Sequence, residues 1–269
     1  MTDKIKLAEL TSAEAKELLT DEAVILIPMG SLEDQGVHAP MGDYLGAECV
    51  AHDIARKARE LGVPTFVTPP IPFGGRDAFQ SAHGGMSLSH GTLCAVLDDM
   101  IWSLTRQGLT KILFVNGHGG NVAPLNEVAL RWRDKGVILP AFYLWKAAYG
   151  ILKDILGADG AAASSGHGGD PLTSIGLHYY PEILRLDLMT DPAPADLTFM
   201  GMKVAGFAET SYDGVPIQMP IEAAEAAPHG IRGGHPKNSS ADTGAKLSAR
   251  LAEVGAGLIR DHVSKGFAA

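Results

Sequence analysis

Short apolar runs alternate with stretches of helical spacing along the first half of the chain. The runs at 23–27 and 111–115 are rich in aliphatic residues and are closed by Pro or Gly, which is typical of buried strands. Less regular strands are predicted at 63–71, which contains several prolines, and at 137–145. Apolar residues recur at helical spacing in four other segments, 11–20, 44–61, 90–106 and 122–135. This alternation predicts an α/β fold with a mostly parallel sheet and helices on both faces.

The second half of the chain is less regular. We expect an Ala/Gly-rich loop at 146–170, a helix at 171–180 and a well-patterned helix at 240–262. The proline-containing segment 187–237 has no clear period, and it can be a lid, an oligomer contact or a small antiparallel excursion. No linker composition is evident, so residues 1–269 are predicted to form a single domain.

Candidate metal ligands follow two of the predicted strands. Glu33 and Asp43 come after the first strand, and His118 comes after the strand that ends at 115. Side chains beyond the carboxyl ends of parallel strands share one crevice. Two carboxylates and an imidazole, with a position left for water, suit Zn²⁺, Mn²⁺ or Fe²⁺ in a hydrolytic site. Alternatively, the two acids cap helices and His118 hydrogen-bonds a loop, and spacing alone leaves both interpretations open.

A second pair of candidates, His167 and Asp170, lies in a Gly-rich stretch. Cleavage of a C–N bond needs a proton for the leaving nitrogen, and a histidine can supply it. Asp170 can orient that ring or activate water, or it can simply cap a helix that starts at Pro171. His38 and Gln35 share the loop of Glu33, and His38 is either a ligand or a supporting group.

Composition narrows the class of partner. The net charge of -9 carries no electrostatic signature of nucleic-acid binding, so a small molecule is the expected partner. Cys49 and Cys94 both fall in helical patterns, and no disulfide is expected. The N-terminus lacks a signal-peptide layout and no apolar run is long enough to span a bilayer, which predicts a cytoplasmic protein without membrane contact. No serine-hydrolase elbow, phosphate-binding loop or dinucleotide fingerprint is present.

Four segments together resemble the creatininase (creatinine amidohydrolase) family. Its first motif, roughly G-S/A-x-E-Q-H-G-P-H-L-P-x-x-T-D, is similar to residues 30–43, and its second, N-G-H-G/x-G/E-N, is similar to residues 116–121. The family's His-Ala-Gly-Glu-x-Glu-Thr-Ser and G-V-x-G segments are similar to residues 167–174 and 230–233. The resemblance implies a three-layer α/β/α fold, a divalent metal centre (Zn, Mn or Fe) and hydrolysis of an amide-type C–N bond. It also implies a cytoplasmic homo-oligomer, often a hexamer.

The resemblance assigns the metal to Glu33, Asp43 and His118. Gln35 and Gly120 replace the His and Glu that help to hold the second metal in creatininase, and Glu33 and Asp43 are one residue closer than in the family pattern. One or two ions per chain therefore stay open, and creatinine itself is disfavoured. The leading hypothesis is a metal-dependent amidohydrolase acting on a small cyclic or linear amide, with His167 and Asp170 as catalytic residues. The alternatives are deformylase- or peptidase-type C–N cleavage at the same site, or a non-catalytic relative that binds metal or ligand.

Overall fold

The computed structural model describes residues 3–79 and 82–266. The α-helices are α1 Ser12–Leu18, α2 Tyr44–Glu60, α3 His90–Thr105, α4 Val122–Arg133, α5 Leu144–Ser164, α6 Leu172–Tyr179, α7 Ala223–Ala226 and α8 Ala241–Asp261. The strands are β1 Val24–Met29, β2 Thr65–Val67, β3 Ile112–Asn116, β4 Ala141–Tyr143, β5 Gly166–His167, β6 Thr198–Phe199, β7 Met202–Gly206, β8 Glu209–Tyr212, β9 Val215–Gln218 and β10 Arg232–Gly233.

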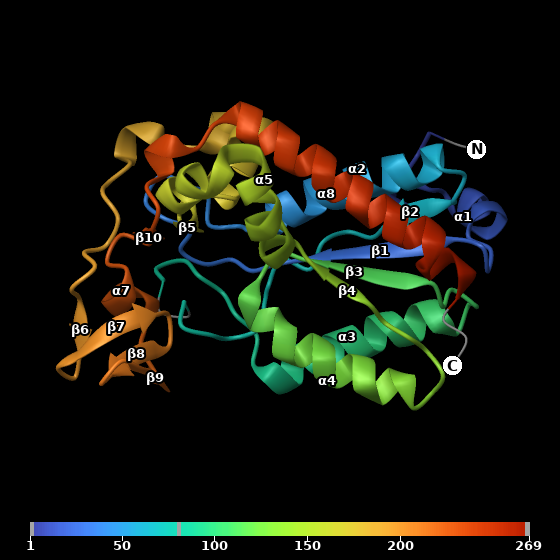
Figure 1. The fold of residues 1–269 in the computed structure, drawn as a ribbon. Coiled ribbons are helices and arrows are strands. Elements are labelled where there is room, and N and C mark those ends of the chain that lie inside the picture. The colour runs from blue at the N-terminus through green and yellow to red at the C-terminus, as the bar shows by residue number, and fades with distance from the viewer. Residues whose placement is uncertain (1–2, 80–81, 267–269) are drawn as a thin grey trace.

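The central sheet is parallel and has helices on both faces. Its strand order is β2-β1-β3-β4, and every pairing in it is parallel. Helices α2 and α8 lie on one side of the sheet, whereas α3 and α4 lie on the other (Figure 1). The predicted α/β/α layering with a mostly parallel sheet is therefore confirmed.

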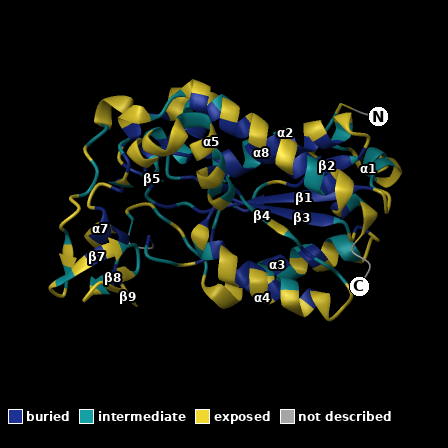
Figure 2. Cartoon of the chain, viewed as in Figure 1, coloured by how far each residue is buried: buried dark blue, intermediate teal, exposed yellow. Residues whose placement is uncertain are grey.

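Strand β1 is buried on both faces, as a continuous apolar run requires (Figure 2). Its alternate residues point into two separate cores. Leu26 packs with Val50 and Ile54 of α2 and with Leu247 of α8, on one side. Ile25 and Ile27 belong to the other core, together with these residues of α3 and α4: Leu93, Leu97, Ile101, Leu125 and Val128. Because the two cores pack on both faces of β1 and β3, the loops that follow these strands start from well-defined positions.

Helix boundaries follow the capping signals in the sequence. Thr11 and Glu14 form a reciprocal capping box at the start of α1. The Ser240 side chain accepts a hydrogen bond from the backbone N–H of Thr243, which fixes the start of α8. The predicted helices at 11–20, 44–61, 90–106, 122–135, 171–180 and 240–262 are all present within a few residues of their expected ends.

The strand predicted at 137–145 is present but covers only Ala141–Tyr143. The prediction of a loop at 146–170 was wrong, because this Ala/Gly-rich segment is mostly helix α5. Alanine is the best helix former, and Leu144, Ala148 and Leu152 bury one face of the helix against the core. Gly157, with φ of 73° and ψ of 172°, is not helical, so α5 consists of two helical segments joined by a kink at this residue.

Segment 187–237 contains the small antiparallel excursion that was one of three alternatives. Strands β6 to β9 form a four-stranded antiparallel sheet in chain order, visible at the left of Figure 1. The chain then returns, and β10 pairs antiparallel with β5, so that Arg232 lies opposite His167. Cys49 and Cys94 are both free, as predicted. Among the described residues, no helix has the length and apolar character needed to cross a bilayer.

Candidate metal centre

The ends of β1 and β3 bring the three predicted ligands together. Glu33 lies in the loop after β1, Asp43 immediately precedes α2, and His118 follows β3. One donor atom from each of the three lies within 4.8 Å of the others. The Nδ1 atom of His118 lies 3.2 Å from Oε1 of Glu33 and 3.4 Å from Oδ2 of Asp43. Register explains this convergence, because Met29 at the end of β1 pairs with Asn116 at the end of β3.

These separations fit a common cation. Donor atoms about 2.0–2.1 Å from a tetrahedral metal lie roughly 3.3 Å from one another. The other ring nitrogen of His118, Nε2, lies 3.2 Å from the carbonyl oxygen of Gly75 and 3.3 Å from Oδ2 of Asp77. A proton on Nε2 is held by these two acceptors, so the lone pair of Nδ1 is directed toward the carboxylates. Metal-binding histidines use this arrangement of a ligating nitrogen and a hydrogen-bonded remote nitrogen.

Capping does not explain the two acids. Asp43 stands at the N-cap position of α2, but its side chain makes no capping hydrogen bond there. It accepts instead from the backbone N–H and the hydroxyl of Ser31. Glu33 precedes no helix directly, and its Oε1 accepts a hydrogen bond of 2.9 Å from the amide of Gln35. Hydrogen bonds from Ser31 and Gln35 thus orient the two carboxylates, and each of them has an oxygen directed at His118.

The two carboxylates, and not burial itself, make the group favour a positive charge. Glu33, Asp43 and His118 are all buried. Burial raises the pKa of Asp43, although hydrogen bonds from His118 and Ser31 oppose the rise. Burial lowers the pKa of His118, but its hydrogen bonds to Asp43 and Glu33 outweigh this and raise the pKa well above the ordinary value. Without a cation, the carboxylates thus retain a proton on the imidazole, and a divalent ion can take the place of that proton.

Asp77 is part of the site, and sequence analysis missed it. Burial raises its pKa, and the negative charge of Glu33 adds to the rise. It lies in an irregular segment after β2 rather than at a predicted strand exit. That segment is fixed by Asn121, whose Oδ1 accepts from the N–H of Gly75 and whose Nδ2 donates to the carbonyl of Gly30. The neighbouring Gly74-Gly75 pair, which allows close backbone approach, was the one available signal.

The positions associated with a second metal offer no comparable donor set. Gln35 presents its amide nitrogen to Glu33. Gly120 has no room for a side chain: an added Cβ would lie 2.5 Å from the carbonyl oxygen of Gly75 and 2.5 Å from Nε2 of His118. His38 is buried and its Nε2 contacts the hydroxyl of Thr173 at 3.0 Å. His38 is therefore not part of the three-residue group formed by Glu33, Asp43 and His118.

His167 is linked to the cavity at the three-residue group through Phe79, which lines that cavity and also contacts His167. Its imidazole stacks on Phe79 with ring centroids 4.4 Å apart, and Phe207 from the β7–β8 turn meets it edge-on at 5.0 Å. Nδ1 of His167 is 2.7 Å from the carbonyl oxygen of Gly230. Nε2 is buried and has no hydrogen-bond partner among the described residues.

Asp170 is fully buried at the start of α6. Its Oδ1 accepts a hydrogen bond of 3.2 Å from the N–H of Ser174, which is a capping contact. Its Oδ2 has no hydrogen-bond partner within the part of the chain that the structure describes. The capping role is thus present, whereas the catalytic role stays a prediction.

The cavity at the three-residue group is small. It measures about 10 Å³ and is lined by Glu33, Asp77, Phe79 and His118, among others. This volume is close to that of a single water. A much larger cavity of about 540 Å³ lies between α4, β4 and α5, where Leu125, Tyr143 and Lys146 line it. Its lining contains none of the three candidate ligands.

Comparison with known proteins gives one consistent result. The family model for creatininase, described as creatinine amidohydrolase, matches residues 8–259. A mycofactocin precursor peptide peptidase from Mycobacterium ulcerans is 28% identical over 216 residues, which are 78% of this chain and 80% of the relative. The creatinine amidohydrolase of Pseudomonas putida is 26% identical over 211 residues, 72% of this chain and 79% of the relative.

Solved structures agree on the fold. The structure of "Creatininase Mn" superposes with a TM-score of 0.76 at 24% identity, covering 96% of this chain and 98% of the other. A putative creatinine amidohydrolase from Bacteroides fragilis gives a TM-score of 0.65 at 26% identity, covering 98% of both chains. The resemblance in the motifs therefore extends to nearly the whole backbone.

Proposed function

This chain belongs to the creatininase family, and on that premise we propose that it is a metal-dependent hydrolase cleaving an amide-type C–N bond in a small cyclic or linear substrate. The observation that carries the proposal is the convergence of Glu33, Asp43 and His118, from separate loops, on one buried point. A buried pair of carboxylates beside an imidazole is costly unless a cation or a reaction requires it.

Each residue has a distinct role in this proposal. Glu33, Asp43 and Nδ1 of His118 hold the metal, while Asp77 and the carbonyl of Gly75 fix the ring through Nε2. A divalent ion held by these residues would supply activation of a water molecule and polarisation of the substrate carbonyl.

His167 supplies the proton for the leaving nitrogen. Its Nδ1–H donates to the carbonyl of Gly230, which fixes the ring and leaves Nε2 as the atom that gives up the proton. Phe79 and Phe207 cover the ring and restrict access of bulk water to it. Asp170 supports this region from the start of α6.

We favour one metal ion over two at this buried site. Gln35 faces Glu33 with an amide nitrogen, and Gly120 cannot carry an acid without moving His118 or Gly75. The ion is Zn²⁺, Mn²⁺ or Fe²⁺, since carboxylate and imidazole ligands suit all three. A small amide is the first substrate class to test because the relative from Pseudomonas putida is a creatinine amidohydrolase.

Peptide C–N cleavage is the second candidate, because the relative from Mycobacterium ulcerans is named a peptide peptidase. Deformylation and binding without turnover are the remaining alternatives. The single-domain organisation, the cytoplasmic location and the hexameric assembly stay predictions.

The test is a pair of histidine variants prepared without a nickel tag. We expect His118→Ala to lose one divalent ion per chain by elemental analysis and to lose hydrolysis of whichever substrate the wild-type protein turns over. The panel contains lactams, hydantoins, formamides and short peptides. His262→Ala, at an exposed position after α8, is the matched control and should keep both properties. Full metal content in His118→Ala would refute the ligand assignment. A wild-type protein that binds metal but turns over no member of the panel would refute the proposed hydrolase activity.

A further inference from the structure

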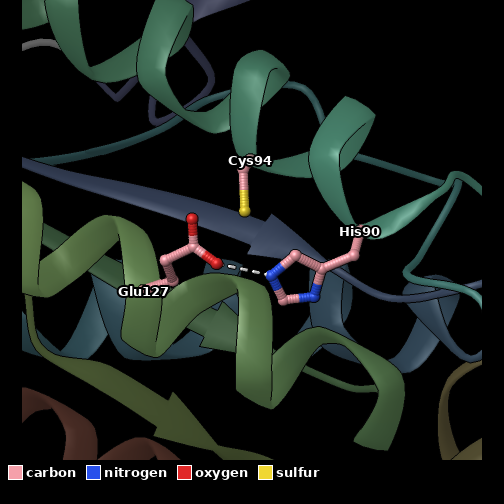
Figure 3. Close-up of side chains that lie close together, drawn as sticks. All are labelled: His90, Cys94 and Glu127. Atoms are coloured by element: carbon pink, nitrogen blue, oxygen red, sulfur yellow. Dashed lines mark hydrogen bonds and ion pairs between the residues drawn. The ribbon is translucent and has the colours of Figure 1, made fainter.

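Helices α3 and α4 carry a second group of metal-type ligands, away from the strand exits. It consists of His90 and Cys94 of α3 and Glu127 of α4. His90 and Cys94 are four residues apart, so they lie on the same face of α3. Figure 3 shows Cys94 directed from α3 into the space between the two helices, with Glu127 and His90 on either side of it.

We propose that this group binds Zn²⁺ through Nε2 of His90, Sγ of Cys94 and Oε2 of Glu127, with water as the fourth ligand. Their donor atoms all lie within 4.8 Å of one another. Zinc bound tetrahedrally by sulfur, nitrogen and oxygen holds these atoms about 3.3–3.6 Å apart. Small side-chain rotations therefore suffice, and no movement of the helices is needed.

The contacts in the group leave one donor atom of each residue for the ion. Nε2 of His90 and Oε2 of Glu127 are 2.7 Å apart, as expected for a shared proton that a cation can replace. The other oxygen of Glu127 accepts from Arg131 at 2.7 Å, which fixes the carboxylate with Oε2 toward His90. The thiol of Cys94 makes a long contact of 3.9 Å with the carbonyl oxygen of Pro124, and the side chain of Arg131 lies within hydrogen-bonding reach of the sulfur.

Charge and exposure also suit Zn²⁺. A thiolate and a carboxylate balance the two charges of the ion, and the positive charge of Arg131 is offset by Asp98 at 2.6 Å. Binding releases the Cys94 thiol proton to solvent and places the proton of the neutral His90 ring on Nδ1, while the sulfur and Nε2 lone pairs form bonds to the metal. Cys94 is buried at the base of the group, whereas His90 and Glu127 are about half exposed, so water reaches the open position. A soft thiolate ligand favours Zn²⁺ over Mg²⁺ or Ca²⁺.

Cobalt is the probe that separates this site from the buried one. A thiolate bound to Co²⁺ gives a near-ultraviolet charge-transfer band, and the group of Glu33, Asp43 and His118 contains no thiol. Under reducing conditions we expect the wild-type protein to develop this band with one equivalent of Co²⁺ and to lose it when Zn²⁺ is added. Cys94→Ser should abolish the band, whereas Cys49→Ser should retain it because Cys49 lies on α2, across the sheet.

Two further variants test the site independently, because misfolding of Cys94→Ser would also abolish the band. His90→Gln and Glu127→Gln change exposed side chains, and each should weaken Co²⁺ binding by about tenfold or more. His118→Ala should keep the band, so failure of the proposed hydrolase and failure of this site are separable. A wild-type protein without the band, or a band that survives Cys94→Ser, would overturn the proposal.

Discussion

Gly120 is the position where the structure makes its sharpest prediction. The Cβ introduced by Gly120→Ala would lie 2.5 Å from both the carbonyl oxygen of Gly75 and Nε2 of His118. These two atoms are 3.2 Å apart and hydrogen-bonded to each other. The methyl group therefore enters between a donor and its acceptor, and the pair has to separate.

The cost can be worked out from these contacts. Overpacking a rigid interior costs ~1–3 kcal/mol, and a buried polar group that loses its partner costs ~1–3 kcal/mol more. We expect Gly120→Ala to lower the free energy of unfolding by about 2–6 kcal/mol. Since the His118 ring is displaced, the variant should also bind less metal at the buried site.

Gly119 provides the matched control. A Cβ on Gly119 has its nearest neighbour at 3.4 Å, the hydroxyl of Tyr143, which is an ordinary contact. Gly119→Ala should therefore change the free energy of unfolding by less than about 0.5 kcal/mol. Urea denaturation followed by circular dichroism, with elemental analysis of the same samples, measures both effects. Equal stability and equal metal content in the two variants would refute the argument. Gly120→Glu carries the same Cβ, so it should not create a second metal position.

Two further predictions concern charge. Asp77→Asn removes the carboxylate 3.3 Å from Nε2 of His118, so we expect Zn²⁺ affinity of the buried site to fall by about 10–100-fold in competition with a chromophoric chelator; unchanged affinity would contradict this role. Glu14 accepts hydrogen bonds from Lys4 and Thr11, which lower its pKa from 4.5 to about 2, so its stabilising effect is complete above pH 4.5 and is lost as the pH falls toward 2. The urea midpoint of Glu14→Gln should therefore lie below that of the wild type at pH 7 and approach it at pH 2, and a pH-independent difference would rule this out.

The convergence of ligands could be predicted because it depends on strand direction. β1 and β3 are parallel and adjacent, so the loops after the two strands meet at one edge of the sheet. Short apolar runs closed by Pro or Gly located both strands, and two motifs located Glu33, Asp43 and His118. Helix ends were equally accessible, because caps such as Ser240 are local signals.

Asp77 and α5 could not be predicted in the same way. Asp77 reaches His118 only because Asn121 draws the Gly75 segment toward the strand exits, a contact between residues 46 positions apart. The helical character of α5 was hidden by its glycines, although its buried face has ordinary helical spacing. The β6–β9 sheet packs on only a small cluster of buried residues, and its edge strand β9 is exposed. Its sequence therefore shows no clear alternation of apolar and polar residues from which the strands could be predicted.

The pairing of β5 with β10 sets an order in which the protein can mature during synthesis. All three candidate ligands have been translated once the chain reaches residue 118, whereas His167 is positioned by Gly230 and by Arg232 opposite it. Chains fold from the N-terminus as they emerge from the ribosome. The three candidate ligands are therefore present in a nascent polypeptide well before the residues that position His167.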